Sequence, residues 1–190
     1  MHMPNGTEVV KAGPPRIRAA RLEDLPALTD IYNHYVIHTA ITFDLVPFAP
    51  EERRSWFDAH ETTGRYRLLV GTDADDRIIG YATTSPWRPK AAYQTTVESS
   101  VYCDPTTVGR GYGRALYGAL FDAIAHEDVH RIVAGVSLPN PASIRLHERC
   151  GFERVGVFPA VGRKFDRYWD VAWFQRPLRL GAHGSATEQS

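Results

Sequence analysis

The stretch that most constrains the fold is VGRGYGRALYGAL, residues 108–120, where three glycines in five positions precede a run of good helix formers. A glycine-rich turn at the start of a helix presents backbone N–H groups at the positive end of the helix dipole, which is a natural site for phosphate. At Gly111 and Gly113 the lack of a Cβ would also let a ligand approach the backbone closely. The segment predicts a strand-to-helix turn that can hold a pyrophosphate, with a plain tight turn as the alternative.

Two common phosphate-binding loops are excluded by the neighbouring residues. A nucleoside-triphosphate loop needs Gly-Lys-Ser/Thr, whereas Gly113 is followed by Arg-Ala. A dinucleotide fingerprint needs a third glycine or alanine in register and an acidic residue at the end of the next strand. Counting from Gly111, the third position is Leu116, and the next apolar run ends GVSL without an acid. What remains is a backbone cradle, to which Arg110 and Arg114 could add positive charge.

Apolar periodicity predicts a single mixed α/β domain over residues 16–179. The expected order is a strand, two helices, three strands, a helix, a strand, a helix and two strands. The second of the two early helices is expected over residues 50–61. We expect residues 1–15 and 180–190 to be poorly ordered tails.

Composition narrows the classes of function. The 190 residues are 43% hydrophobic, enough for a normal core, and the formal net charge of zero gives no electrostatic case for nucleic acid or an anionic membrane as partner. The two cysteines, Cys103 and Cys150, form neither a zinc-ligand nor a disulfide-scaffold pattern, so we expect no metal and a cytoplasmic location. No apolar run approaches the length of a membrane span, and the N-terminal residues lack the apolar core of a signal peptide.

A second segment, LPNPASIRLHERCGF at residues 138–152, follows the glycine turn. Together the two segments resemble the GCN5-related N-acetyltransferase superfamily, in which an Arg/Gln-x-x-Gly-x-Gly/Ala turn grips the pyrophosphate of acetyl-CoA and an Asn-x-x-Ala/Ser helix flanks the pantetheine. The resemblance implies that superfamily's fold, a central mixed sheet flanked by helices, with acetyl-CoA as co-substrate. The sequence departs from the pattern at Val108, where the superfamily has Arg or Gln, so that contact is lost or passes to Arg110. The implied cofactor-binding residues in these two segments are Val108, Gly109, Arg110, Gly111, Tyr112, Gly113, Arg114, Asn140 and Ser143.

Further segments, in the same order along the chain, resemble the phosphinothricin N-acetyltransferase family over about residues 17–178. They are NHY, SPW, AYQTTVESSVYCDP and YWDVAWFQ. Members acetylate the α-amine of glutamate-like amino acids that carry a phosphinyl or sulfoximine group. The resemblance implies acetyl transfer to a small amino acid analogue, such as phosphinothricin or methionine sulfoximine. It also implies a homodimer whose partner chain helps to close the substrate site.

Acetyl transfer from a thioester to an amine requires an acceptor for the amine proton, a polarised carbonyl and a tolerated leaving thiolate. Glu98 lies in a predicted strand of otherwise core-like residues, so its carboxylate is either paired structurally or placed for chemistry. The resemblance implies that Glu98 is the general base for direct attack. It also implies that the backbone of Val101, Tyr102 and Cys103 pairs with the pantetheine arm. His147 stands where the wider superfamily often has a tyrosine acting as general acid, and the resemblance makes it the second catalytic candidate.

The substrate candidates are Arg88, Lys90 and Tyr93, close to Glu98 in sequence, because two cations and a phenol suit a carboxylate and a phosphinyl or sulfoximine oxygen. By resemblance, Phe43 lies near the substrate entrance. Two alternatives stay open: the same fold acting on a polyamine, an aminoglycoside or a protein N-terminus, and a CoA-binding domain without turnover. Glu98 argues against the second, and the neutral net charge argues mildly against polyamines.

Overall fold

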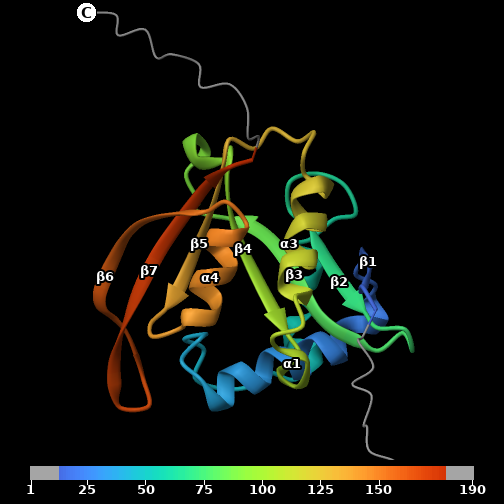
Figure 1. Ribbon diagram of the computed structural model, residues 1–190, viewed down its shortest axis with the longest axis horizontal. Helices are drawn as coiled ribbons and strands as arrows, with labels where there is room; N and C mark the ends of the chain where they lie inside the picture. Colours follow the sequence, from blue (N-terminus) through green and yellow to red (C-terminus); the bar gives the residue numbers. More distant parts are fainter. Residues whose placement is uncertain (1–12, 179–190) are drawn as a thin grey trace, which may run out of the picture.

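The computed structural model describes residues 13–178 of the chain as a seven-stranded mixed sheet with helices on both faces (Figure 1). Its element order confirms the mixed α/β fold and the predicted succession of strands and helices. The expected tails lie outside the described residues except for residues 13–15, which have no regular secondary structure. The strands are β1 (Arg16–Ala19), β2 (Leu68–Thr72), β3 (Ile78–Pro86), β4 (Thr96–Cys103), β5 (Arg131–Ser137), β6 (Glu153–Lys164) and β7 (Arg167–Pro177). The helices are α1 (Leu25–His38), α2 (Arg54–Asp58), α3 (Tyr112–Ala123) and α4 (Pro141–Arg149).

The strands lie in the order β1-β2-β3-β4-β5-β7-β6. Every neighbouring pair is antiparallel except β4 and β5, which are parallel. The chain passes from β4 to β5 through α3, as a crossover between parallel strands requires. Within the described sheet, β4 and β5 are therefore the one pair of neighbouring strands that run in the same direction. The glycine turn follows β4 in the sequence.

The two faces of the sheet are covered by different helices. Leu28 of α1 packs with Val70 and Tyr81 on one face. Leu116 of α3 packs with Leu69 on the other, because successive strand residues point to opposite sides. Successive side chains of β4 therefore point alternately to the face of the sheet that α1 covers (the α1 face) and to the face that α3 covers (the α3 face).

The expected helix at residues 50–61 is shorter than predicted. A 3₁₀ turn, Pro50–Arg53, leads into α2, which ends at Asp58. Arg53 is buried, donates a hydrogen bond to the Leu28 carbonyl at 3.2 Å and lies 3.9 Å from the centre of the Trp56 ring. This inward-facing cation ties the segment to α1, a long-range contact that local periodicity does not reveal. None of the helices within residues 13–178 is both long and apolar enough to cross a membrane.

Candidate active site

A cleft opens where β4 and β5 separate. Their pairing runs only from Thr96↔Arg131 to Glu98↔Val133, although both strands continue beyond it. Figure 1 shows the two strands fanning apart toward their C-terminal ends. The cleft between them has a volume of about 50 Å³ and is lined from both strands, from α3, from α4 and from the loop after α1. Its lining residues include Ile41, Ser99, Ser100, Val101, Tyr102, Tyr117, Asn140, Ser143 and His147.

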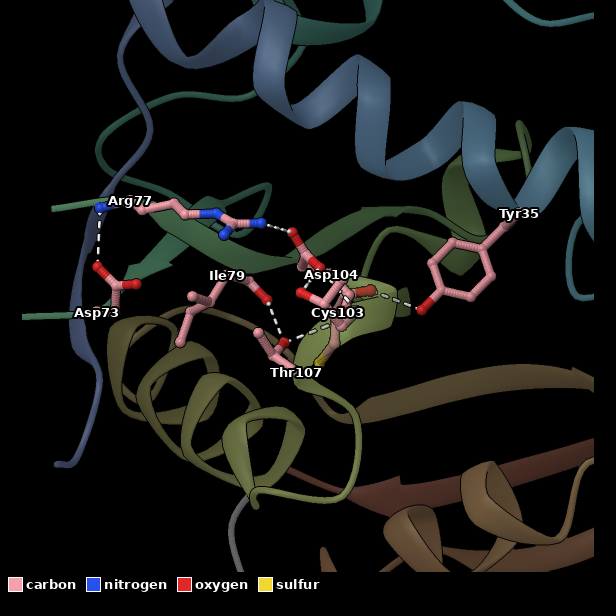
Figure 2. Close-up of polar contacts among 8 residues, drawn as sticks. Tyr35, Asp73, Arg77, Ile79, Cys103, Asp104 and Thr107 are labelled. Atoms are coloured by element: carbon pink, nitrogen blue, oxygen red, sulfur yellow. Dashed lines mark hydrogen bonds and ion pairs between the residues drawn. The ribbon is translucent and has the colours of Figure 1, made fainter. Parts of the chain in front are cut away.

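The register of β4 decides which backbone groups face this cleft. The Asp104 amide donates to the Ile79 carbonyl at 2.9 Å, so alternate residues of β4 direct their backbone groups toward β3. Val101 is in the other set and faces the gap, beyond the last residue that pairs with β5. Cys103 also faces away from β3, but its carbonyl accepts a hydrogen bond from the Tyr35 hydroxyl at 2.6 Å (Figure 2). Of the three residues predicted to pair with pantetheine, Val101 is thus the best placed, while Tyr102 directs its backbone toward β3.

The glycine turn owes its shape to two left-handed residues. Gly109 has φ +87° and Gly111, the N-cap of α3, has φ +84°. Side chains rarely adopt such values, so these positions favour glycine even though a Cβ there would meet no atom within 4 Å. Gly113 differs, because its Cβ would lie 3.0 Å from the Leu146 side chain of α4. Two of the three glycines therefore set the turn and the third lets α3 approach α4.

The helix that follows the turn begins without a side-chain cap at Gly111. The first N–H groups of a helix have no partner within the helix, and at this end they carry a partial positive charge. Arg110 and Arg114 are both exposed beside them, and so is Val108, which replaces the superfamily's Arg or Gln. The geometry is compatible with the predicted cradle for an anion, whose charge the helix end and these two arginines would complement.

The start of the turn is held by a hydrogen-bond network (Figure 2). The Asp104 carboxylate accepts hydrogen bonds from the Thr106 amide at 2.8 Å and from the Arg77 guanidinium at 2.9 Å. The Thr107 hydroxyl donates to the carbonyls of Asp104 and Ile79. Burial opposes ionisation of Asp104, but these donors outweigh it and lower its pKa. The carboxylate therefore stays charged and fixes the turn to β3.

Glu98 lies at the point where the two strands part, since Glu98↔Val133 is their last pair. It shares the α1 face of β4 with Tyr102, which packs in the cluster around Tyr81. Within residues 13–178 its half-buried carboxylate has no hydrogen bond or ion pair. Burial raises the pKa of Glu98, and the positive charge of Arg88 offsets part of this increase. Glu98 itself does not line the cleft, but the next two residues, Ser99 and Ser100, do. An unpaired carboxylate of raised pKa next to a cleft is well suited to accept a proton.

His147 lies on the α3 face and is only 3% exposed. Its Nδ1 is 2.8 Å from the Ser143 carbonyl, which can only accept, so Nδ1 carries the proton. Its Nε2 then accepts from the Tyr117 hydroxyl at 3.0 Å. Burial lowers the pKa of His147 and favours the neutral ring, which packs against Phe152 and Phe174. The ring is thus a fixed hydrogen-bond acceptor for Tyr117.

Tyr117 is one of the cleft residues that the sequence did not predict. Its ring is fully buried, stacks on Phe121 and lines the cleft together with His147. The sequence did contain a signal, because a hydroxyl-bearing side chain stands next to Leu116 on the apolar side of the predicted helix. Such a group needs a buried polar partner.

Asn140 and Ser143 lie together at the start of α4. The Asn140 side-chain oxygen accepts from the Ser143 amide at 3.1 Å, which makes Asn140 the helix N-cap. Both residues also line the cleft. Their structural role and their predicted place beside the cofactor are therefore compatible.

The predicted substrate residues are less closely assembled. Arg88, Lys90 and Tyr93 lie in the exposed segment after β3, outside the lining of the cleft, although the charge of Arg88 influences Glu98. The Tyr93 ring contacts the Trp87 ring edge-on, with centres 5.0 Å apart. Phe43 lies in the loop between α1 and the 3₁₀ turn, against β6.

Comparison with known proteins agrees with this geometry. The model of the acetyltransferase (GNAT) domain family matches residues 17–173. The chain is 56% identical over 177 residues to a phosphinothricin N-acetyltransferase of Streptomyces coelicolor, covering 93% of this chain and 100% of the relative. It is 40% identical over 162 residues to an L-methionine sulfoximine/L-methionine sulfone acetyltransferase of Pseudomonas paraeruginosa, covering 85% and 94%. The structure of a phosphinothricin acetyltransferase from Sinorhizobium meliloti in complex with acetyl-CoA matches with a TM-score of 0.83 and 33% identity, covering 94% of each chain. Fold, cleft and sequence together show that this chain belongs to the GNAT family of acetyltransferases.

Proposed function

We propose that the protein transfers the acetyl group of acetyl-CoA to the α-amine of phosphinothricin or methionine sulfoximine, with Glu98 as general base. The observation that carries this proposal is the unpaired carboxylate of Glu98 at the point where β4 and β5 part. A domain that only binds CoA has no use for such a group. The similarity to acetyltransferases named for these two substrates supports the substrate class.

The residues of the cleft fit acetyl-CoA as the acetyl donor. The left-handed turn at Gly109 and Gly111 leaves the N-terminus of α3 open to a pyrophosphate, whose charge Arg110 and Arg114 complement. The free backbone edge at Val101 suits the amide groups of a pantetheine arm. When bound, acetyl-CoA supplies the activated thioester carbonyl.

Glu98 is proposed to accept the amine proton. An α-amine is mostly protonated near neutral pH, because its pKa is about 8. The raised pKa of Glu98 brings the carboxylate closer to the pH at which it works, which improves proton transfer. The deprotonated amine can then attack the thioester directly, without a covalent enzyme intermediate. Burial raises the pKa of the Cys103 thiol to about 11, which makes it a poor nucleophile.

The leaving thiolate needs a proton donor on the other side of the cleft. His147 was the candidate from resemblance, but its only N–H is engaged with the Ser143 carbonyl. We therefore propose that the Tyr117 hydroxyl turns from His147 Nε2 to the departing sulfur and stabilises the thiolate with a hydrogen bond, and that His147 acts through it as a positioning residue. Burial raises the pKa of Tyr117, so the hydroxyl keeps its proton. Glu98 then lies on the α1 face for the attacking amine, and Tyr117 on the α3 face for the departing sulfur.

We also propose that the protein works as a homodimer that contacts itself through the β6–β7 hairpin. β6 is an edge strand, and the apolar side chains Val155, Phe158, Val161, Phe165 and Tyr168 of the hairpin are each more than half exposed. An apolar edge strand of this length favours pairing with a second copy. Light scattering should give twice the chain mass at micromolar concentration, and Phe158→Asp should lower it. A monomeric wild-type mass with full activity would contradict this proposal.

The experiment that tests the function is a thiol-release assay over a panel of amines. Phosphinothricin and methionine sulfoximine should be the best substrates. Glutamate should be much poorer, because its planar carboxylate cannot match a tetrahedral phosphinyl or sulfoximine group. The panel also includes methionine sulfone, spermidine, kanamycin and a short peptide. Preference for spermidine or kanamycin would still support acetyl transfer but would contradict the proposed substrates. Acetyl-CoA binding without release of thiol on any amine would indicate a non-catalytic domain.

A further inference from the structure

The loop between α1 and the 3₁₀ turn, residues 39–49, forms part of the wall of the cleft. Ile41 of this loop lines the cleft beside Ser100 and Tyr102, whose side chains belong to the α1 face of β4. Glu98 lies on that same face. The position of the loop therefore bears on the space available to an amine that approaches Glu98.

The Phe43 ring of this loop lies unusually close to the backbone of Gly162 in β6. A Cβ built on Gly162 of β6 would lie 2.3 Å from Cζ of Phe43. The Phe43 ring thus occupies the space that a side chain at position 162 would need. Gly162 lies where β6 resumes its pairing with β7, opposite Trp169, after an irregular stretch. The missing side chain of Gly162 therefore leaves space on the hairpin for the Phe43 ring.

A buried cation makes the second contact. Lys164 is only 3% exposed, and its Nζ donates to the Thr42 carbonyl at 2.8 Å, one residue before Phe43. Burial lowers the pKa of Lys164, and the carboxylate of Asp44 counteracts this effect. Burying a lysine is costly unless partners satisfy it, so this hydrogen bond fixes the loop backbone against the hairpin.

The far side of the loop is tied to α1. The Tyr32 hydroxyl makes hydrogen bonds with Thr42 Oγ1 at 2.7 Å and with the Asp44 carboxylate at 2.5 Å. These bonds connect α1 to residues 42–44 and, through Lys164, to β6. Sequence positions more than a hundred apart thus converge on one short segment.

We propose that Gly162 and Lys164 form a latch that holds the loop of residues 39–49, and with it Ile41, as a wall of the amine site. Both are positioning residues for amine recognition: Gly162 acts through Phe43 and Lys164 through Thr42, and neither touches the reacting atoms. This inference rests on the proposed function, since it concerns how the same site selects its amine. It assigns to the β6–β7 hairpin a role within its own chain, in addition to any contact with a second copy.

The test is a double-mutant cycle on Phe43 and Gly162. Gly162→Ala should displace the Phe43 ring and raise the KM for the amine about tenfold or more, with kcat changed less and the affinity for acetyl-CoA unchanged. Phe43→Ala removes the ring, so adding Gly162→Ala to it should have little further effect. Lys164→Met should raise the amine KM in the same way. Gly156→Ala is the matched control on β6, where a Cβ meets nothing within 4 Å, and it should behave as wild type.

Hydrogen exchange gives a readout that needs no substrate. Amides of residues 39–49 should exchange faster in Gly162→Ala and Lys164→Met than in wild type, while those of α3 stay unchanged. Multiplicative effects of Phe43→Ala and Gly162→Ala on KM, or a parallel loss of acetyl-CoA affinity, would overturn the latch. Unchanged exchange in the loop would also overturn it. Failure of wild type to acetylate any amine would instead refute the proposed function and leave the exchange result to decide on the latch.

Discussion

Replacing Glu98 with glutamine is expected to lower kcat for amine acetylation by about 10²–10⁴-fold and to leave acetyl-CoA binding unchanged, because an amide cannot accept the amine proton. The loss should exceed that caused by His147→Ala. A thiol, with a pKa of about 8.5, departs with less assistance than an ammonium group needs to lose its proton. Steady-state kinetics with phosphinothricin, together with calorimetric titration of acetyl-CoA, measure both quantities.

The proposed role of Glu98 as base also predicts how kcat/KM depends on pH. Burial raises the pKa of Glu98, with Arg88 opposing, and a base acts only when it is deprotonated. Wild-type kcat/KM should therefore fall on the acid side at a higher pH than an ordinary carboxyl group would cause. In Glu98→Gln the acid limb should no longer follow Glu98 and should instead follow the higher pKa of the amine itself. The defect should also narrow as the pH rises through the pKa of the amine, because the substrate then arrives deprotonated.

A matched control separates the base from a general effect of removing a charge. Glu61→Gln makes the same chemical change on an exposed side chain outside the cleft, and it should retain wild-type rates. A pH–rate profile of Glu98→Gln that runs parallel to wild type would contradict the role as base. So would a larger loss in a folded His147→Ala variant.

The order of elements and the glycine turn could be predicted from the sequence because both depend on local patterns. Apolar periodicity distinguishes strands from helices, and the glycines of the turn include two with φ values that other residues rarely adopt. The location of Glu98 also followed from a local anomaly, a carboxylate within an otherwise core-like strand. Its place at the parting of β4 and β5 required the register between two strands, which no local pattern contains.

The parts that escaped prediction depend on contacts between distant segments. The bond between Lys164 and the Thr42 carbonyl joins residues 122 positions apart, and a lysine in a strand gives no sign that it is buried. Tyr117 was overlooked because the apolar face of its helix explained the segment without it. Lys90 and Tyr93 are close to Glu98 along the chain and lie exposed outside the lining of the cleft, so their contact with the substrate stays a prediction. Which side chains lie at the cleft depends more on the direction of their strand than on their distance from Glu98 along the sequence.

Gly111→Val is expected to weaken acetyl-CoA binding at least tenfold, about 1.4 kcal/mol. Gly111 has φ +84°, and a β-branched residue is a true outlier at such a value, so the variant must rebuild the turn that opens α3. It also adds a branched side chain where the pyrophosphate is proposed to approach. Calorimetric titration of wild type and variant measures the change, and unchanged affinity would rule out this turn as the cradle.

Two further substitutions separate backbone strain from occupied space. Asparagine tolerates the left-handed conformation, so Gly111→Asn should keep the turn and lose less affinity than the valine variant. Gly118→Ala lies on the exposed side of α3, where a Cβ meets nothing within 4 Å. It should bind acetyl-CoA as wild type does and stabilise the fold by about 0.5–1 kcal/mol, since alanine favours a helix interior. Affinity should therefore fall in the order Gly118→Ala, Gly111→Asn, Gly111→Val. Equal losses in the two Gly111 variants would mean that space for the ligand, and not the backbone conformation, limits binding at this turn.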